Sequence, residues 1–111
     1  MSGTTRYAIN RSQHIAYTVH GPDDAEAIVL QHGWSSSKEA WDAYIEAFVE
    51  SGYRCINIDS LGHGESDKPH DRDAYQRAER ANDVIAVMDA ESVTRAHFIG
   101  YSMGGWICLL Y

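Results

Sequence analysis

Along the first twenty residues, apolar and polar positions alternate as they do in a half-buried β-strand. Ile15, Tyr17 and Val19 recur at every second position, so in an extended chain they point to one face. Residues 6–10 and 14–20 flank a short polar turn. This pattern predicts an antiparallel hairpin with one buried face.

Three later runs are short and largely apolar, a pattern typical of strands that are covered on both faces of a sheet. They are residues 27–30, 55–59 and 96–101. Strands of this kind are usually parallel and are joined by helices. We therefore expect an α/β fold with a mostly parallel sheet of five strands. The N-terminal antiparallel hairpin would lie at one side and residues 96–101 at the other.

Helical spacing of apolar residues appears between these runs. Ser36 and Glu39 fit a capping box that would start a first helix, and Gly52 would end it. Asp73 with Gln76 is expected to start a second helix. The apolar faces expected for the two helices are Ala40, Trp41, Tyr44, Ile45, Phe48 and Val49 in the first, and Ala78, Ala81, Ile85 and Met88 in the second.

The last residues depart from this regular order. Residues 106–111 continue as an apolar helical segment to the final position, without a capping glycine, a polar stretch or a proline. A complete domain would rarely finish in mid-helix with its apolar side chains uncovered. We therefore expect residues 1–111 to be the N-terminal part of one larger domain.

Composition places the chain among globular proteins and limits its partners. Of 111 residues, 44% are hydrophobic and 23% charged, with a formal net charge of -7. These values are typical of one soluble domain and argue against a nucleic-acid surface. No run approaches the roughly 20 apolar residues of a membrane span, and the N-terminus lacks the apolar core of a signal peptide. We expect no membrane contact and a cytoplasmic location.

The two cysteines, Cys55 and Cys108, both lie in apolar runs. We expect them to be small core residues in a reducing compartment. Neither has the spacing of a metal ligand.

The strongest chemical signal is Gly-x-Ser-x-Gly at residues 100–104. It lies between an expected strand and an apolar helix, so the chain must turn sharply there. Such a turn holds Ser102 in a strained conformation and leaves no room for side chains at Gly100 and Gly104. The hydroxyl would then stand at a helix N-terminus, where free N–H groups favour an oxyanion. For these five residues alone, a Gly- and Ser-rich turn without chemistry is the alternative.

A second motif, His32-Gly33-Trp34, follows the strand expected at 27–30. An acyl-transfer site needs two backbone N–H donors for the oxyanion. One comes from the residue after the serine, here Met103, and the other from a loop on the neighbouring strand. The Trp34 N–H is the candidate for the second donor, and Gly33 would let the backbone approach a ligand closely. The alternative is a simple turn after a strand.

A third segment, residues 59–66, follows the next strand and contains two glycines. The glycines allow a tight loop beside the same strand ends, so we expect this loop to shape a pocket rather than to react. His63 is a less favoured candidate for a general base. It belongs to a different crossover, and no neighbouring carboxylate clearly orients it.

Metal and nucleotide sites are disfavoured. Residues 62–67 lack the third glycine of a dinucleotide fingerprint, and the chain has no Gly-Lys-Ser or Gly-Lys-Thr of a phosphate loop. The polar residues Asp67, His70, Asp71 and Asp73 fit a solvated loop better than a metal site. We expect neither a metal nor a cofactor.

Together the three motifs resemble the α/β-hydrolase superfamily, specifically its serine-nucleophile members. The resemblance covers nearly the whole chain from Tyr17 onward. The resemblance implies that Ser102 is the nucleophile and that the N–H groups of Trp34 and Met103 form the oxyanion hole. The family's triad acid and histidine follow the serine, but residues 103–111 contain no Asp, Glu or His. It therefore implies a truncated α/β-hydrolase fold that ends inside the helix after the nucleophile elbow. A serine at 102 also disfavours the dehalogenase and epoxide-hydrolase branches, which have an aspartate there.

By this resemblance the chain belongs to a serine hydrolase that cleaves an ester or related acyl bond of a small molecule through a Ser102 acyl-enzyme. The isolated chain is expected to be inactive. C–C bond hydrolases and cofactor-free peroxidase-like members share the motifs and stay open, as does a non-catalytic binding or regulatory remnant. Further expected partners are a missing C-terminal half or a second copy of the chain, because residues 96–101 would otherwise be an uncovered edge. An Asp and a His encoded beyond Tyr111 would favour the enzyme.

Overall fold

A single five-stranded sheet forms the middle layer of the molecule. The computed structural model describes residues 3–110. The strands are β1 (Arg6–Asn10), β2 (Gln13–His20), β3 (Ala27–Gln31), β4 (Arg54–Ile58) and β5 (Ala96–Gly100), in the spatial order β1-β2-β4-β3-β5. The α/β class is confirmed. The hairpin lies at one side of the sheet and β5 at the other, as the sequence predicts.

The sheet combines the expected antiparallel hairpin with the expected parallel strands, and β2 is the strand that runs against its neighbours. β1 pairs with β2 in the antiparallel sense, and β2 in turn pairs antiparallel with β4. β3 pairs in parallel with both β4 and β5. The carboxyl ends of β3, β4 and β5 therefore meet at one edge, which is where open α/β sheets bind ligands.

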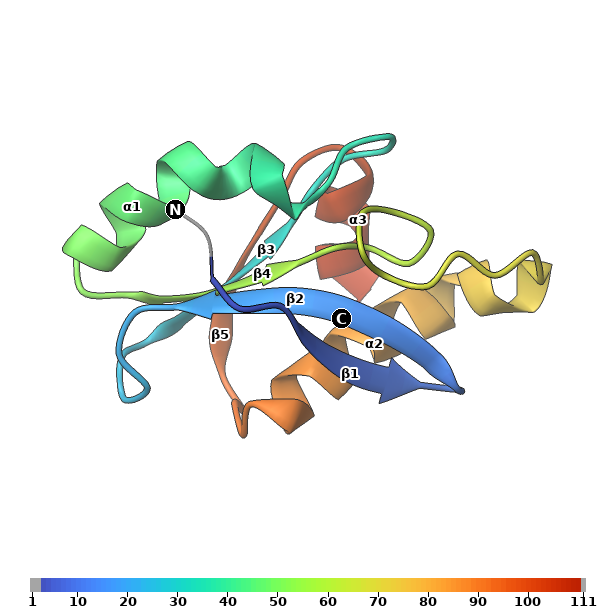
Figure 1. Ribbon diagram of the computed structural model, residues 1–111, viewed down its shortest axis with the longest axis horizontal. Coiled ribbons are helices and arrows are strands. Elements are labelled where there is room, and N and C mark those ends of the chain that lie inside the picture. The colour runs from blue at the N-terminus through green and yellow to red at the C-terminus, as the bar shows by residue number, and fades with distance from the viewer. Residues whose placement is uncertain (1–2, 111) are drawn as a thin grey trace.

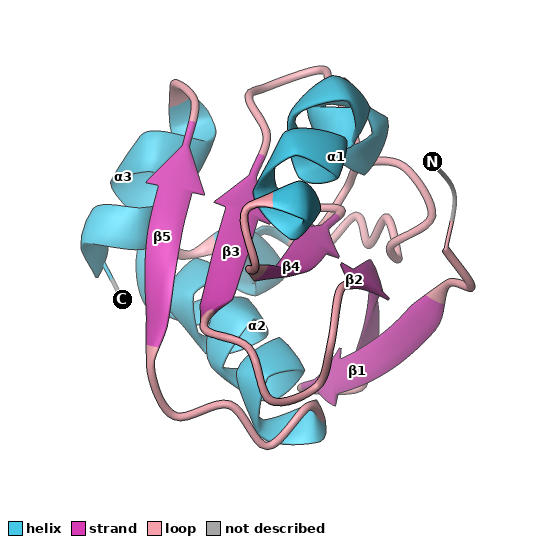
Figure 2. Ribbon diagram, turned by 90° about the vertical axis from the view of Figure 1, so that its left-hand side faces the viewer, coloured by secondary structure: helices cyan, strands magenta, loops and turns pink. Residues whose placement is uncertain are grey.

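Helices cover both faces of the sheet (Figures 1 and 2). They are α1 (Asp42–Glu50) with the short 3-10 helix η1 (Lys38–Trp41) on one face, and α2 (Arg77–Ala90) and α3 (Met103–Leu110) on the other. Ile28 and Leu30 of β3 pack in the cluster under α1, and Val29 packs in the cluster under α2 and α3. Because β3 is buried on both faces, its sequence is apolar without alternation. Cys55 is buried in the core and Cys108 is half-buried, both as free thiols.

The predicted capping box at Ser36 and Glu39 is wrong. The helical segment begins with η1 after Ser37, whose side chain makes no capping hydrogen bond, and α1 begins only at Asp42. The Lys38 N–H instead donates to a carboxylate oxygen of Asp59 at 2.8 Å. A residue distant in sequence thus provides the cap that local reasoning assigned to a serine. Gly52 follows the end of α1 with a φ of 94°, as expected for a glycine there.

The predicted buried face of α2 is also wrong in part. Ile85 is 40% exposed and Ala78 is exposed, although both were assigned to the core face. The residues that are buried are Arg80, Ala81, Asp83, Val84, Val87 and Met88. Ala81 and Met88 are thus buried as predicted, but two charged residues share the buried face with them, so apolar spacing alone locates only part of it. A further 3-10 helix, η2 (Arg72–Tyr75), precedes α2, and its N-terminus is capped by the Asp71 side chain.

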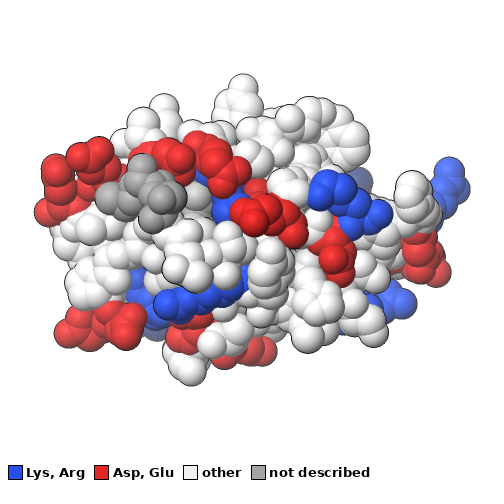
Figure 3. Space-filling model, in the orientation of Figure 1, with Lys and Arg blue, Asp and Glu red and all other residues white. Residues whose placement is uncertain are grey.

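Acidic side chains gather over α1 at the upper left of the face shown in Figure 3. No continuous basic stripe crosses this face among the residues drawn in colour, which agrees with the net charge of -7. Within residues 3–110, no helix is long and apolar enough to cross a bilayer.

β5 lies at the edge of the described sheet. It pairs with β3 alone, and the next helix exposes Trp106 and, at 88%, Leu109. The sequence analysis predicts association with a missing C-terminal half or a second copy of the chain. An apolar helix surface beside an unpaired strand edge is the arrangement on which that prediction depends.

Asp83 is a buried carboxyl group in the contact between α2 and β1. It is 5% exposed, and its Oδ1 accepts a hydrogen bond of 2.8 Å from Asn10 Nδ2. Its Oδ2 has no hydrogen-bond partner in the described part of the chain. Burial raises the pKa of Asp83 to about 6, although Asn10 and the Arg80 charge oppose the shift. The ionised form of Asp83 therefore destabilises the folded state.

Replacing Asp83 with Asn is expected to change how stability depends on pH. The folded-state pKa lies above the unfolded one, so the wild type loses stability as the pH rises from about 4 to about 6, by up to about 3 kcal/mol. Asp83→Asn removes this loss, so its stability relative to wild type should rise over that interval and stay constant above it. Urea unfolding at pH 4, 6 and 8 measures the difference.

The matched control is Asp89→Asn, which changes an exposed carboxylate of the same helix. It should leave the pH dependence unchanged. A stability difference for Asp83→Asn that is the same at pH 4 and pH 8 would show that the buried carboxyl group is not the cause.

Candidate active site

Loops from the ends of β3, β4 and β5 surround one wide pocket of about 910 Å³. The residues lining it are Trp34, Ser35, Leu61, Gly62, His63, Tyr75, Arg80, Ser102, Met103 and Trp106. All three sequence motifs therefore contribute to a single cavity. Parallel pairing of β3 with β4 and with β5 brings them together, because it aligns the carboxyl ends of the three strands.

Ser102 occupies a strained turn between β5 and α3. Its φ is 54°, in a region that non-glycine residues rarely adopt, and its side chain is exposed. A Cβ atom at Gly104 would lie 2.1 Å from the Gln31 carbonyl oxygen, and one at Gly100 would lie 2.4 Å from the Gly104 carbonyl carbon. Neither position has room for a side chain. The strained conformation of Ser102 and the need for both glycines are as the sequence predicts.

The loop after β3 is held against this turn. The Tyr101 N–H donates to the Gln31 carbonyl at 3.1 Å, and a Cβ atom at Gly33 would lie 3.0 Å from the Tyr101 ring. The N–H groups of Trp34 and Met103 donate to no acceptor within residues 3–110. Two free backbone donors thus border the pocket into which Ser102 opens.

His63, which lines the pocket, and His32, whose ring centre lies 5.0 Å from that of His63, connect loops to each other. His63 Nε2 accepts a hydrogen bond from the Ser35 N–H at 3.1 Å, and its Nδ1 lies 3.2 Å from the Leu61 carbonyl. His32 Nε2 accepts from the Ser60 N–H at 3.0 Å. Burial lowers the pKa of His32, which favours the neutral ring. Both rings are thus engaged with the backbone.

No general base contacts Ser102 within the described residues, because its hydroxyl forms no hydrogen bond with any of them. His63 lines the same pocket, but both its ring nitrogens have backbone partners. His63 therefore stays a poor candidate for the base, as the sequence suggests.

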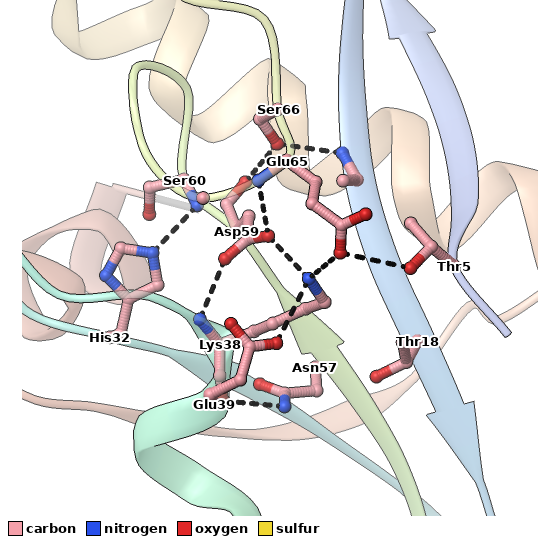
Figure 4. A network of polar contacts seen from close by, with 12 residues as sticks. Thr5, Thr18, His32, Lys38, Glu39, Asn57, Asp59, Ser60, Glu65 and Ser66 are labelled. Carbon is pink, nitrogen blue, oxygen red and sulfur yellow. Dashed lines mark hydrogen bonds and ion pairs between the residues drawn. The ribbon is translucent and has the colours of Figure 1, made fainter. Parts of the chain in front are cut away.

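The loop after β4 is shaped by a buried ion pair (Figure 4). Asp59 is fully buried and its Oδ2 lies 2.6 Å from Lys38 Nζ, which also lies 2.8 Å from Glu65 Oε1. Burial alone would lower the pKa of Lys38, but the hydrogen bonds to Asp59 and Glu65 raise it above its usual value. A Cβ atom at Gly64 would lie 2.3 Å from the Asp59 carboxylate. The glycine lets the loop fold over the carboxylate.

Ser66 completes this loop. Its hydroxyl donates to the Asp59 carbonyl at 2.6 Å and accepts from the Ala16 N–H at 2.8 Å. The loop is therefore tied to β2 as well as to η1. Residues 59–66 shape the pocket, as predicted, whereas the role of Lys38 as the partner of Asp59 was not foreseen.

No group of His, Cys, Asp and Glu side chains within residues 3–110 could hold a metal ion. Of the polar residues considered for such a site, Asp67 lies 3.2 Å from His14 Nδ1, and Asp71 caps η2. Asp73 accepts a hydrogen bond from Gln76 Nε2 at 3.2 Å, and His70 is exposed.

Arg80 and Tyr75 line the pocket but were not identified from the sequence. Arg80 was missed because the predicted apolar face of α2 excluded position 80. Val84 and Val87 follow Arg80 by four and seven residues, and positions with this spacing share one helix face. That spacing is the feature of the sequence that could have placed Arg80 on the buried face.

A family model described as the alpha/beta hydrolase fold matches residues 26–111. A non-heme chloroperoxidase of Burkholderia pyrrocinia is 44% identical over 82% of this chain and 32% of its own length. A bifunctional esterase/perhydrolase of Acinetobacter calcoaceticus is 39% identical, again over 82% of this chain and 32% of its own length. This chain therefore spans about a third of the length of these relatives.

Among solved structures, epoxide hydrolase A from Mycobacterium thermoresistibile superposes with a TM-score of 0.89. The match covers 96% of this chain and 34% of that one, at 24% sequence identity. At this identity the likeness shows the fold alone.

Adding one methyl group at Gly104 is expected to disrupt the turn. In Gly104→Ala the new Cβ would collide with the backbone of Gln31, and such overpacking should cost about 3 kcal/mol or more. Thermal and urea unfolding measure the loss.

Gly105→Ala is the matched control, because its Cβ would lie 3.6 Å from the nearest neighbouring atom. An alanine there should be neutral or slightly stabilising in a helix. If both variants were equally stable, the backbones of Gly104 and Gln31 would not approach each other as closely as described.

Proposed function

This chain belongs to the alpha/beta hydrolase fold family, and on that premise we propose that it forms part of a serine hydrolase in which Ser102 attacks an ester or related acyl bond. The observation that carries the proposal is the setting of Ser102. It is an exposed serine with a φ of 54° that opens into a pocket bordered by two free backbone N–H groups. Strained residues of this kind are concentrated at functional sites.

The proposed reaction uses each of these groups. Ser102 Oγ attacks the acyl carbon and its proton passes to a base, while the carbonyl oxygen becomes an oxyanion. That oxygen accepts hydrogen bonds from the Trp34 and Met103 N–H groups. The base then returns the proton to the leaving oxygen, and the intermediate collapses to an acyl-enzyme as the alcohol leaves. Water then attacks the acyl-enzyme and releases the acid.

The base is the group that residues 3–110 do not provide at Ser102. A serine hydroxyl is a weak nucleophile until a neighbouring base takes its proton. We propose that the histidine and its orienting acid come from residues outside this sequence, as the order of the family's triad implies. The same residues would extend the sheet beyond β5, where the strand edge is unpaired.

A second candidate reaction has support from the names of relatives. One is a non-heme chloroperoxidase and another a bifunctional esterase/perhydrolase. In this alternative, peroxide instead of water takes the acyl group from Ser102, and the first half of the reaction is unchanged. No feature of the site favours C–C bond cleavage or a non-catalytic binding role.

The proposal is tested by the rate at which a fluorophosphonate labels Ser102 compared with Ser92. Ser92 is also exposed and has a φ of 56°, but it does not line the pocket. Oxyanion donors are worth about 100-fold or more in rate, so Ser102 should be labelled at least about 100 times faster. Peptide mass spectrometry quantifies both sites in the same sample.

Turnover of p-nitrophenyl acetate by this chain should be negligible, because losing the base of a comparable triad costs about a million-fold. Ser102→Ala should remove the fast labelling and leave Ser92 unaffected. Equal labelling of the two serines would reject the hydrolase and favour a non-catalytic role. Robust turnover that is lost in His63→Ala would identify His63 as the base.

A further inference from the structure

Arg80 projects from α2 into the pocket that contains Ser102. Arg80 is only 5% exposed. One guanidinium nitrogen lies 3.8 Å from the Met103 sulfur, and the guanidinium carbon lies 5.8 Å from the centre of the Tyr75 ring. Because Met103 directly follows Ser102, the charge of Arg80 is close to the reacting centre.

Arg80 forms no ion pair with a carboxylate in the described part of the chain, unlike the arginines at 6 and 54. Arg6 and Arg54 both pair with Glu91, at 2.8 Å and 2.7 Å. The Arg80 side chain forms one hydrogen bond within residues 3–110, to the Met103 sulfur, and it also interacts with the Tyr75 ring and with the charge of Asp83.

Asp83, one turn further along α2, forms no ion pair with Arg80. Its Oδ1 accepts from Asn10, and no acceptor atom of Asp83 forms a hydrogen bond with Arg80. A guanidinium has five N–H donors, so most of the Arg80 donors have no acceptor within residues 3–110. A buried charge that no carboxylate hydrogen-bonds is costly, and because Arg80 lines the pocket of Ser102, this indicates that it serves a ligand there.

We propose that Arg80 binds a carboxylate of the substrate, so that the substrate is an ester or related acyl compound with a second, ionised carboxylate group. The inference rests on the proposed function of Ser102. The planar guanidinium matches a carboxylate with two parallel hydrogen bonds. A single guanidinium balances the charge of a monoanion, whereas a phosphate dianion would keep one negative charge unbalanced in a pocket with a single arginine in its lining.

The rest of the pocket fits the carbon skeleton of such a substrate. Trp34, Tyr75 and Trp106 supply aromatic surface around Arg80 and Ser102. One charged residue within an otherwise largely apolar pocket fixes the orientation of a ligand. Arg80 would thus select substrates with an anionic group and set which carbonyl reaches Ser102.

The experiment measures binding by NMR and requires no turnover. The chain has three methionines, and labelling their methyl groups with ¹³C gives a signal for Met103 beside the Arg80 guanidinium. Met88 is buried in the core and serves as the internal reference. The probes are methyl hydrogen glutarate, its neutral analogue dimethyl glutarate, and inorganic phosphate.

We expect the Met103 signal to shift saturably with the monoester, with roughly 10- to 100-fold higher affinity than for the diester. Arg80→Met should remove this preference, and Arg80→Lys should retain part of it because the charge remains. Arg77→Met, which changes an exposed arginine of the same helix, should change nothing. Ser102→Ala should keep the preference.

Equal affinity for the monoester and the diester in the wild type would overturn the inference, without the need for any variant to fold. Tighter binding of phosphate than of the monoester would overturn the choice of a carboxylate, and loss of the preference in Arg77→Met would show that it reflects overall charge. If the preference exists but Ser102 labels no faster than Ser92, the hydrolase proposal fails and the anion site stands. If Ser102 is reactive and no preference exists, the anion site fails and the hydrolase proposal stands.

Discussion

The backbone of α3 passes so close to the end of β3 that the Gly104 position cannot hold a side chain. The carbonyl of Gln31 occupies the space where a Cβ atom would lie. This approach fixes the first turn of α3 directly above the sheet edge, and it leaves Ser102 to make the connection with a φ of 54°. The position of the serine, the exposure of its hydroxyl and the free N–H of Met103 all follow from it.

Holding Ser102 in this conformation costs on the order of 1–3 kcal/mol, and packing on both sides of the turn offsets the cost. Met103 and Ile107 of α3 are buried against the core cluster that contains Val29. On the other side, Tyr101 donates a backbone hydrogen bond to Gln31. The turn is therefore stabilised by burial of apolar side chains after it and by strand pairing before it.

The parts of the molecule that could be predicted from the sequence are those in which local pattern and tertiary environment agree. β3 is apolar because it is buried along its whole length, and the glycines at 100 and 104 are required by the turn itself. The errors arise where a distant residue takes over a local role. Asp59 caps η1, which made the nearby Ser36 a wrong candidate.

The buried face of α2 could not be found by apolar periodicity, because Arg80 and Asp83 lie on it. Both face groups from other elements, Met103 for Arg80 and Asn10 for Asp83. Charged residues on a buried face are uncommon unless they have partners or a function. Here Arg80 marks the part of the pocket that a motif search does not detect.

The central claim is that the turn aims Ser102 at the two free N–H groups of Trp34 and Met103. A crystal structure of the protein after reaction with a fluorophosphonate tests this most directly. The account predicts phosphorus bonded to Ser102 Oγ, with the phosphoryl oxygen about 3 Å from both backbone nitrogens. An adduct at Ser102 whose phosphoryl oxygen points away from both nitrogens would contradict it.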